Sequence, residues 1–338
     1  MFAALSMLAT ICFGAPMASS DTPFHIIKRI PVGGEGGWDY LTVDSAARRL
    51  YLSRGRHVMV VNLQTDKIEG DIPNTPGVHG IAIVSDLGRG FISNGGDSTV
   101  TIFDLKTLKE TSRVKVGSRP DAIIYDPASK RVFTFNAGSS DTTAIDAAAG
   151  TVAGSVPLGG KPEAAAADGK GTIFVNVEDK NEVIAFDSKT LTAKHHWPLS
   201  PGEQPTGLAL DQKHHRLFSA CHNKKMIVLD SETGKVIATP DIGDGTDGAA
   251  FDEKESLAFS SNGDGTLTIV KEQSPDKFAV LETVTTEPGA RTIALDPRTH
   301  HIYLVTAKLQ PPPPGTDPNA RRRRTYEPGS FVVLVVGK

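Results

Sequence analysis

The feature that most constrains this chain is a pattern that recurs about every 40 to 44 residues. The stretch SRPDAIIYDPASKRVFTFN (118–136) places a charged residue after a proline, then an apolar run, a turn and a second apolar run. The same outline returns as KPEAAAADGKGTIFVN and as QPTGLALDQKHHRLFSAC. With the aspartate of the turn as a marker, equivalent positions are Asp44, Asp126, Asp211, Asp252 and Asp296. Such a repeat indicates an array of similar supersecondary units.

Each repeat contains four short β-like runs. In the third repeat they are AIIY, RVFTFN, DTTAID and VAGSVPLG, and the 33 glycines and 22 prolines of the chain supply turns between such runs. A four-stranded unit of about 40 to 45 residues is typical of a propeller blade. The chain is therefore predicted to be all-β, a seven-bladed β-propeller with four antiparallel strands per blade. Its units begin near Trp38, His79, Asp121, Glu163, Thr206, Asp247 and Arg291.

The two ends of the repeat array complement each other. The last unit supplies only three runs, RTIALD, HIYLVT and FVVLVVG, whereas HIIKRIPVG (25–34) has no unit before it. We expect this N-terminal run to pair into the last blade and close the ring, which removes an exposed sheet edge. The predicted propeller covers residues 24–338, with a Pro/Arg-rich insertion over residues 308–328 in the seventh blade.

The repeats resemble a known family. NGGDSTVTIFDLKTLKETSRVKVG (94–117) matches the Asn-x-x-(Ser)-x-Thr-Val-x-hydrophobic-hydrophobic-Asp pattern of the YVTN β-propeller family. The chain is similar over roughly residues 24–338 to exported YncE-like bacterial proteins. Such propellers are mostly assigned as extracytoplasmic binding proteins, and the resemblance implies that role here.

The first twenty residues, MFAALSMLATICFGAPMASS, are apolar and end in small residues. They predict a signal peptide over residues 1–20 and therefore a periplasmic or secreted protein. After cleavage Cys221 is the one cysteine left, so no intramolecular disulfide is expected.

The net charge of −3 gives no general reason to expect nucleic acid or an anionic membrane as partner. We expect a monomer without membrane insertion.

The variable residue after each proline is predicted to lie at the mouth of the central channel, because the first strand of a blade starts where the second ends. These positions form the predicted ligand-binding rim: Asp39, His79, Asp121, Glu163, Thr206, Asp247 and Arg291. Crowded carboxylates raise one another's pKa unless a cation compensates. A divalent cation (Ca²⁺, Mg²⁺, Mn²⁺ or Zn²⁺) held by His79, Asp121 and Glu163 is one hypothesis. The alternative is a water-filled channel whose side chains bridge neighbouring blades.

A secondary rim is expected where the second strands and their loops end. It consists of Arg54, His57, Cys221, His222, Arg321, Arg322, Arg323, Arg324 and Tyr326. Cys221 and His222 suggest either a soft metal site or a nucleophile with a base, and the alternative is a buried structural cysteine beside a surface histidine. The four arginines and Tyr326 suggest a clamp for an anionic ligand. Nucleic acid is not expected, because the acidic rim would repel a polyanion.

Two groups of residues are predicted to have structural roles only. The asparagines that end second strands, Asn94, Asn136 and Asn262, suit tight turns with positive φ. The histidine pairs are predicted to be surface positions: His195–His196, His214–His215 and His300–His301.

Three functions therefore stay open. The first is an extracytoplasmic binding protein that receives a small ligand, a cation or a partner's loop at the mouth. The second is a metal-assisted lactonase, lyase or hydrolase, by analogy with seven-bladed lactonases and streptogramin lyases, in which Glu163, Asp121 and His79 hold the ion or act as base and Arg291 stabilises an anion. The third is a protein-interaction scaffold. No Ser-His-Asp order, P-loop, dinucleotide fingerprint or CxxC motif appears, and no catalytic residue is assigned.

Overall fold

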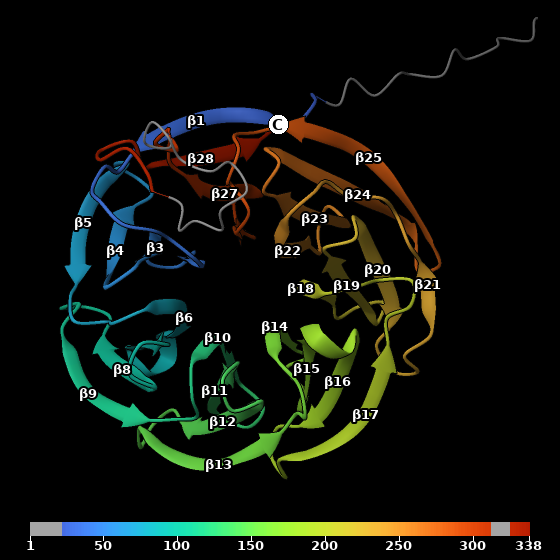
Figure 1. The fold of residues 1–338 in the computed structure, drawn as a ribbon, viewed down its shortest axis with the longest axis horizontal. Helices are drawn as coiled ribbons and strands as arrows, with labels where there is room; N and C mark the ends of the chain where they lie inside the picture. Colours follow the sequence, from blue (N-terminus) through green and yellow to red (C-terminus); the bar gives the residue numbers. More distant parts are fainter. Residues whose placement is uncertain (1–21, 312–324) are drawn as a thin grey trace, which may run out of the picture.

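The computed structural model describes residues 22–311 and 325–338. These residues form seven four-stranded antiparallel sheets around a common axis, which confirms the predicted seven-bladed β-propeller (Figure 1). The predicted signal peptide over residues 1–20 and the four arginines of the insertion lie outside the described residues.

The first three blades follow one another along the chain. Blade one comprises β2 (Leu41–Asp44), β3 (Arg49–Arg54), β4 (His57–Asn62) and β5 (Lys67–Ile72). Blade two comprises β6 (Val78–Val84), β7 (Arg89–Asn94), β8 (Thr99–Asp104) and β9 (Glu110–Lys115), with the 3₁₀ turn η1 (Ser85–Leu87) after β6. Blade three comprises β10 (Pro120–Asp126), β11 (Arg131–Asn136), β12 (Asp141–Asp146) and β13 (Thr151–Pro157).

The next three blades repeat the same order from the inner to the outer strand. Blade four comprises β14 (Pro162–Ala167), β15 (Thr172–Val177), β16 (Glu182–Asp187) and β17 (Thr192–Pro198), with η2 (Glu178–Lys180) after β15. Blade five comprises β18 (Pro205–Asp211), β19 (Arg216–Cys221), β20 (Lys225–Asp230) and β21 (Val236–Ala238). Blade six comprises β22 (Thr246–Asp252), β23 (Leu257–Asn262), β24 (Thr266–Ser274) and β25 (Lys277–Thr285).

Blade seven closes the ring with both ends of the chain. Its strands lie in the order β26 (Ile293–Asp296), β27 (His301–Thr306), β28 (Val332–Gly337) and β1 (His25–Pro31). The antiparallel pairing of β1 with β28 is the predicted closure, and it covers the edge that β28 would otherwise expose. Ile30 of β1 is 2% exposed, so the closing strand also contributes to the apolar core.

The core lies in the seams between neighbouring blades. Because each middle strand is covered on both faces by adjacent sheets, strands such as β11 and β15 are buried along most of their length. Phe133 of blade three packs against Phe186 of blade four, with ring centroids 5.7 Å apart. The outermost strands, such as β9, expose most of their polar side chains to solvent. The seams therefore hold the blades in fixed positions around the channel.

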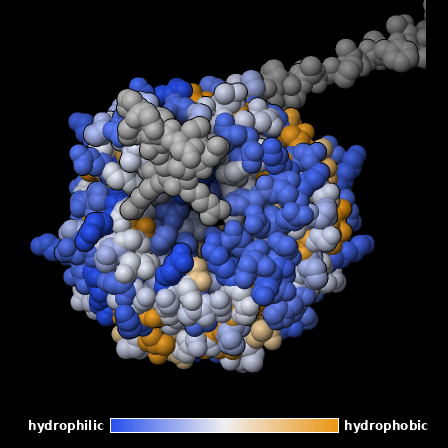
Figure 2. Space-filling view, viewed as in Figure 1, coloured by the Kyte–Doolittle hydropathy of each residue, from blue (hydrophilic) through white to orange (hydrophobic). Residues whose placement is uncertain are grey.

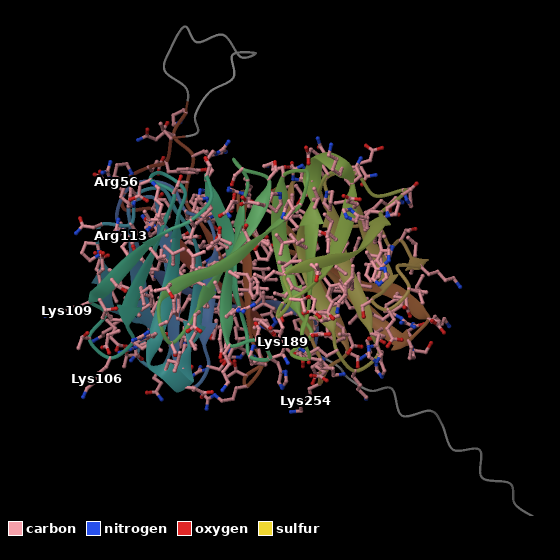
Figure 3. All side chains as sticks on the ribbon, turned by 90° about the horizontal axis from the view of Figure 1, so that it is seen from below. Arg56, Lys106, Lys109, Arg113, Lys189 and Lys254 are labelled. Atoms are coloured by element: carbon pink, nitrogen blue, oxygen red, sulfur yellow. The ribbon has the colours of Figure 1, made fainter. Side chains whose placement is uncertain are left out.

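The turns between first and second strands confirm the aspartate marker used for the repeat. Asp126 ends β10, and its carboxylate accepts the backbone N–H groups of Ala128 and Ser129. Asp211, Asp252 and Asp296 cap their own turns in the same way. These turns lie on the face opposite the channel mouth. Figure 3 shows the two edges, with Arg56 of the β3–β4 turn on one and Lys254 of the β22–β23 turn on the other.

Two structural predictions are wrong in detail. None of the three strand-end asparagines has positive φ; in blade three that conformation falls on Ser140. Asn136 is instead fully buried and donates through Nδ2 to Thr143 Oγ1 at 3.0 Å, which ties the hairpin together. His214 and His300 are not free surface residues, since each lies within hydrogen-bond distance of a buried aspartate.

In the part of the chain that the structure describes, no helix is long and apolar enough to cross a membrane.

Candidate functional site at the channel mouth

Six of the seven predicted rim residues converge on the channel mouth. His79, Asp121, Glu163 and Asp247 are the second residues of their inner strands, and their blades all start at this face. The remaining two, Asp39 and Arg291, stand two residues before β2 and β26. We call these six residues and Lys161 the charged ring.

His79 lies between two carboxylates of the ring. Its Nδ1 is 2.5 Å from Asp39 Oδ2 and 3.5 Å from Asp121 Oδ1. Burial opposes the charged imidazole, but the hydrogen bond to Asp39 and the negative charge of Asp121 raise the pKa of His79 to about 9. His79 is therefore a cation at neutral pH. Burial raises the pKa of Asp121, although the neighbouring imidazolium acts in the opposite direction.

Arg291 connects blade six to blade one. Its Nε donates to Asp247 Oδ2 at 2.5 Å, and its Nη2 is 4.0 Å from Asp39 Oδ1. Burial raises the pKa of Asp247, and the guanidinium of Arg291 limits that rise. Three consecutive inner strands of the ring are thus linked through charged side chains.

Lys161 is the member of the ring that sequence reasoning missed. Its Nζ lies 2.6 Å from Glu163 Oε1 and also contacts Glu178. Burial and the charge of Asp121 raise the pKa of Glu163, against the effect of Lys161. The only available sequence signal was the lysine before the proline in KPE, because the rim was sought after each proline.

The ring therefore contains its own compensating cations. Four carboxylates face three basic side chains, which are His79, Lys161 and Arg291. Three cations offset most, but not all, of the charge of four carboxylates. The predicted trio of metal ligands is also not the one that the geometry brings together. The ligand atoms that lie within 4.8 Å of one another belong to Asp39, His79 and Asp121, while Glu163 pairs with Lys161.

Thr206 has a different role from the rest of the predicted rim. It is 4% exposed, and its hydroxyl donates to the carbonyl oxygen of Thr246 in the next blade at 3.1 Å. Thr292 likewise donates to Asp39 O at 2.8 Å, across the joint between blades seven and one. Thr206 therefore bridges neighbouring blades, as the alternative hypothesis of a water-filled channel expected for the rim side chains.

Tyr40 is a second residue that sequence reasoning did not find. Burial and the nearby charges of Asp121 and Glu163 raise its pKa well above its ordinary value, so the phenol stays protonated. The residue follows Asp39 and lines a cavity of about 190 Å³ within the channel. It offers a hydroxyl donor close to the carboxylates of the ring.

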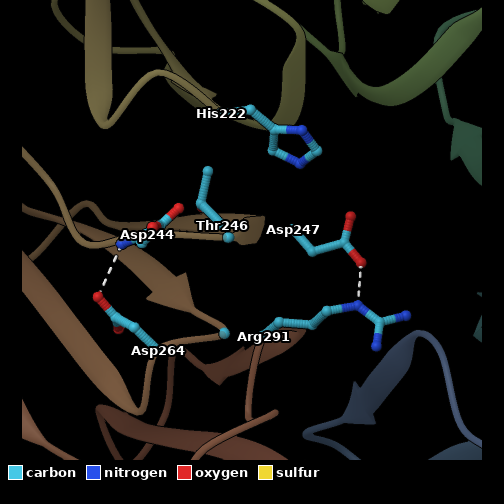
Figure 4. Close-up of a pocket in the computed structure, with 8 residues that line it drawn as sticks. His222, Asp244, Thr246, Asp247, Asp264 and Arg291 are labelled. Carbon is cyan, nitrogen blue, oxygen red and sulfur yellow. Dashed lines mark hydrogen bonds and ion pairs between the residues drawn. The ribbon is translucent and has the colours of Figure 1, made fainter. Parts of the chain in front are cut away.

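A large pocket adjoins the ring above blades five to seven. It has a volume of about 610 Å³ and is lined by His222, Asp244, Thr246, Asp247, Asp264 and Arg291 (Figure 4). The backbone N–H of Asp244 donates to Asp264 Oδ2 at 2.7 Å, which joins the loops before β22 and after β23. Figure 2 shows that this face is largely hydrophilic over blades five and six, beside the central hollow. We call this cavity the mouth pocket.

The secondary rim divides into buried and accessible residues. Arg54 is 2% exposed, and its guanidinium donates to the carbonyl oxygens of Gly33 and Glu35 and lies 3.6 Å from the centroid of Phe331. Its placement in a ligand rim is wrong, because the N-terminal segment covers it. Tyr326 packs against Trp38 with ring centroids 4.7 Å apart, so one of its faces is already covered.

The Cys221–His222 pair does not form a reactive unit. Cys221 is fully buried, and burial raises its pKa to about 12, which keeps the thiol protonated. His222 lines the mouth pocket instead. His57 pairs with Asp71 on the outer strands of blade one, away from the ring.

Comparisons with known proteins bear on the fold. No protein-family model matches the chain, and a search of curated proteins gives no match. Among solved structures, the chain is similar to one titled Kuenenia stuttgartiensis Hydrazine Synthase, with a TM-score of 0.69 and 16% identity over 80% of this chain and 92% of that one. It is also similar to a chain of a Mitotic Checkpoint Complex, with a TM-score of 0.72 and 14% identity over 88% of this chain and 95% of that one. At such identities the similarity shows the β-propeller architecture alone.

Proposed function

We propose that this protein is an extracytoplasmic β-propeller binding protein of the YVTN, YncE-like kind, and that the mouth pocket receives a small polar ligand. The observation that carries the proposal is the pocket itself, a cavity of about 610 Å³ directly beside the charged ring. Its volume falls in the range of small-molecule sites, roughly 300 to 1,000 Å³. The predicted signal peptide supports the extracytoplasmic part of the proposal.

The lining specifies the chemistry of the ligand. Asp244, Asp247 and Asp264 contribute three carboxylates, whereas Arg291 and His222 are the basic side chains of the lining. Arg291 is already paired with Asp247, and Lys224 Nζ lies 3.1 Å from Asp244 Oδ2, so Asp264 is the carboxylate on which an amino group of the ligand is expected. A ligand with at least one amino group and further hydroxyl or amide groups would complement this surface. Its positive charge would lie against carboxylates, and its hydroxyl or amide groups could accept hydrogen bonds from the basic side chains of the lining.

A screen of small polar compounds tests the proposal. Thermal shift with polyamines, amino acids and sugars, followed by calorimetry, should find amine-bearing ligands that bind wild type and lose affinity in Asp264→Asn. Asp97→Asn is the matched control, since Asp97 occupies the same position in the loop of blade two and likewise accepts a threonine hydroxyl. Ligands that bind wild type and Asp264→Asn equally, or a screen without amine-bearing hits, would contradict the proposal.

A second candidate, a metal-assisted hydrolase, lyase or lactonase, is favoured by one observation. Asp39, His79 and Asp121 place one imidazole and two carboxylates within 4.8 Å, which is the donor set of a catalytic metal site once the ion displaces the proton of His79. Metal analysis of the purified protein, with thermal melting before and after chelation, tests it. Metal-free protein whose melting temperature does not respond to added Mn²⁺ or Zn²⁺ would remove this candidate. A scaffold role is the third, since one structural neighbour comes from a protein complex.

A further inference from the structure

A second cluster of charged side chains lies on the face opposite the mouth, in the seam between blades five and six. Asp211 ends β18, His214 lies in the turn that follows, and Glu272 lies near the end of β24. His214 Nδ1 is 2.8 Å from Asp211 Oδ2 and 2.9 Å from Glu272 Oε1. The three ligand atoms lie within 4.8 Å of one another. We call these three residues the seam cluster.

Glu272 occupies a position that other blades fill with neutral side chains. Its backbone N–H donates to the carbonyl oxygen of Ser256 in the turn between the first two strands of its blade. The same bond defines equivalent residues in blades one to five, which are Leu63, Leu105, Ala147, Ser188 and Ser231. Leu63 and Leu105 pack into the apolar seam toward the preceding blade. A carboxylate at this position therefore replaces apolar or small neutral groups.

Two neighbouring seams show what usually faces the turn aspartate. In the seam between blades six and seven, Asp252 Oδ2 lies 2.6 Å from His300 Nδ1 of the next blade. In the seam between blades seven and one, Asp296 pairs with Arg48 of the next blade. In these two seams the turn aspartate faces a base from the next blade. In the seam cluster the next blade, blade six, instead contributes the carboxylate of Glu272.

The carboxylate of Glu272 is close to His214 but accepts no hydrogen bond from it, because the one hydrogen that His214 Nδ1 can carry is directed to Asp211. The Glu272 side chain is 2% exposed, and neither Oε1 nor Oε2 accepts a hydrogen bond from any described residue. Asp211 is buried as well, at 1% exposure of its side chain, and it takes the hydrogen bond of His214. A buried carboxylate that accepts no hydrogen bond is strongly unfavourable unless a cation or a proton neutralises it.

We propose that the seam cluster is a divalent transition-metal site, bound by Asp211, His214 and Glu272, that joins blades five and six. One imidazole nitrogen and two carboxylate oxygens suit Zn²⁺ or a similar ion, with a water as the fourth ligand. That water has access because the His214 side chain is 27% exposed. Ca²⁺ fits less well, since it prefers six to eight oxygen ligands. The competing explanation is an imidazolium held between two carboxylates without metal.

Zn²⁺ titration of the full chain after treatment with EDTA tests the site. Calorimetry should show one strong site in wild type, and Glu272→Gln should weaken it by at least about 100-fold. His79→Gln, which disrupts the cluster at the mouth, should leave this affinity unchanged. In crystals soaked with Zn²⁺, anomalous scattering should give a peak between Asp211, His214 and Glu272. Equal affinity in wild type and Glu272→Gln, or a peak at the mouth alone, would overturn the proposal.

Stability measurements separate the metal site from the metal-free explanation. Glu272→Leu introduces the residue found at this position in blades one and two, so it removes the buried carboxylate without leaving a large cavity. In EDTA this variant should melt at or above the wild-type temperature. Zn²⁺ at 100 times its Kd should raise the wild-type melting temperature by about 4 °C and that of the variant by less than about 1 °C. A variant that melts below wild type in EDTA, with no response of wild type to Zn²⁺, would favour the imidazolium and refute the metal site.

Discussion

Arg54 offers the clearest quantitative test of how the ring is closed. Its guanidinium is buried, donates to Gly33 O at 3.0 Å and Glu35 O at 2.9 Å, and lies 3.6 Å from the centroid of Phe331. It therefore fastens the segment after β1 to blades one and seven. We consider Arg54→Met, which keeps much of the aliphatic volume and removes the charge and the donors.

The expected loss follows from three contributions and one opposing cost. Hydrogen bonds from a charged donor contribute about 2 kcal/mol each, and a desolvated cation–π contact contributes about 2 kcal/mol. Burial lowers the pKa of Arg54 from 12.5 to about 10, which corresponds to a cost of about 3 kcal/mol for the buried charge. The net stabilisation by Arg54 is then about 3 kcal/mol, and Arg54→Met should reduce the free energy of unfolding by about this amount.

Urea denaturation followed by tryptophan fluorescence measures the effect. Arg56→Met is the matched control, because Arg56 lies two residues away and is exposed (Figure 3); its replacement should change the unfolding free energy by less than about 0.5 kcal/mol. If Arg54→Met and Arg56→Met were equally stable, the structural role assigned to the buried guanidinium would be wrong.

Three further predictions concern pH, ring closure and thiol reactivity. Because the pKa of His79 is raised from 6.5 to about 9 on folding, its contribution to stability is complete below pH 6.5 and is lost as the pH rises through 9. Partial exposure limits this loss to about 1 to 2 kcal/mol. Between pH 6 and pH 10 the urea midpoint should therefore fall further in wild type than in His79→Gln, and equal falls would contradict the charged state of His79. Ile30→Ala in the buried face of β1 should cost about 3 kcal/mol, whereas Ile27→Ala, at a position 36% exposed, should cost under about 1 kcal/mol; equal midpoints would contradict the closure by β1. Cys221, buried and with a pKa raised to about 12, should react with a thiol reagent only after unfolding; rapid labelling of the native protein at pH 8 would disprove its inert role.

Much of the architecture was predictable because the repeat fixes it. A blade places its first strand at the channel, so the position after each proline could be assigned to the mouth before any side chain was seen. The missing fourth strand of the last unit and the surplus strand at the N-terminus identified the closure. These inferences depend on backbone geometry, which is the same in each repeat.

The side-chain contacts were less predictable because they depend on which blades meet. Lys161 precedes its proline and still reaches Glu163, so a search limited to the following residue could not find it. Arg54 ends its strand at the mouth, as predicted, yet the N-terminal segment covers it. His214 was assigned to the surface because Glu272, which lies 2.9 Å from it, is about 60 residues further along the chain and belongs to the next blade.

The central claim is that residues from distant blades form a ring at one mouth in which three bases offset most of the charge of four acids. The most direct test is an NMR titration of the His79 imidazole in metal-free protein, assigned by comparison with His79→Gln. Because Asp39 and Asp121 hold the imidazole in its charged form, we predict an inflection near pH 9. An inflection at or below pH 6.5 would contradict the charged ring, because it would show that these carboxylates do not surround His79.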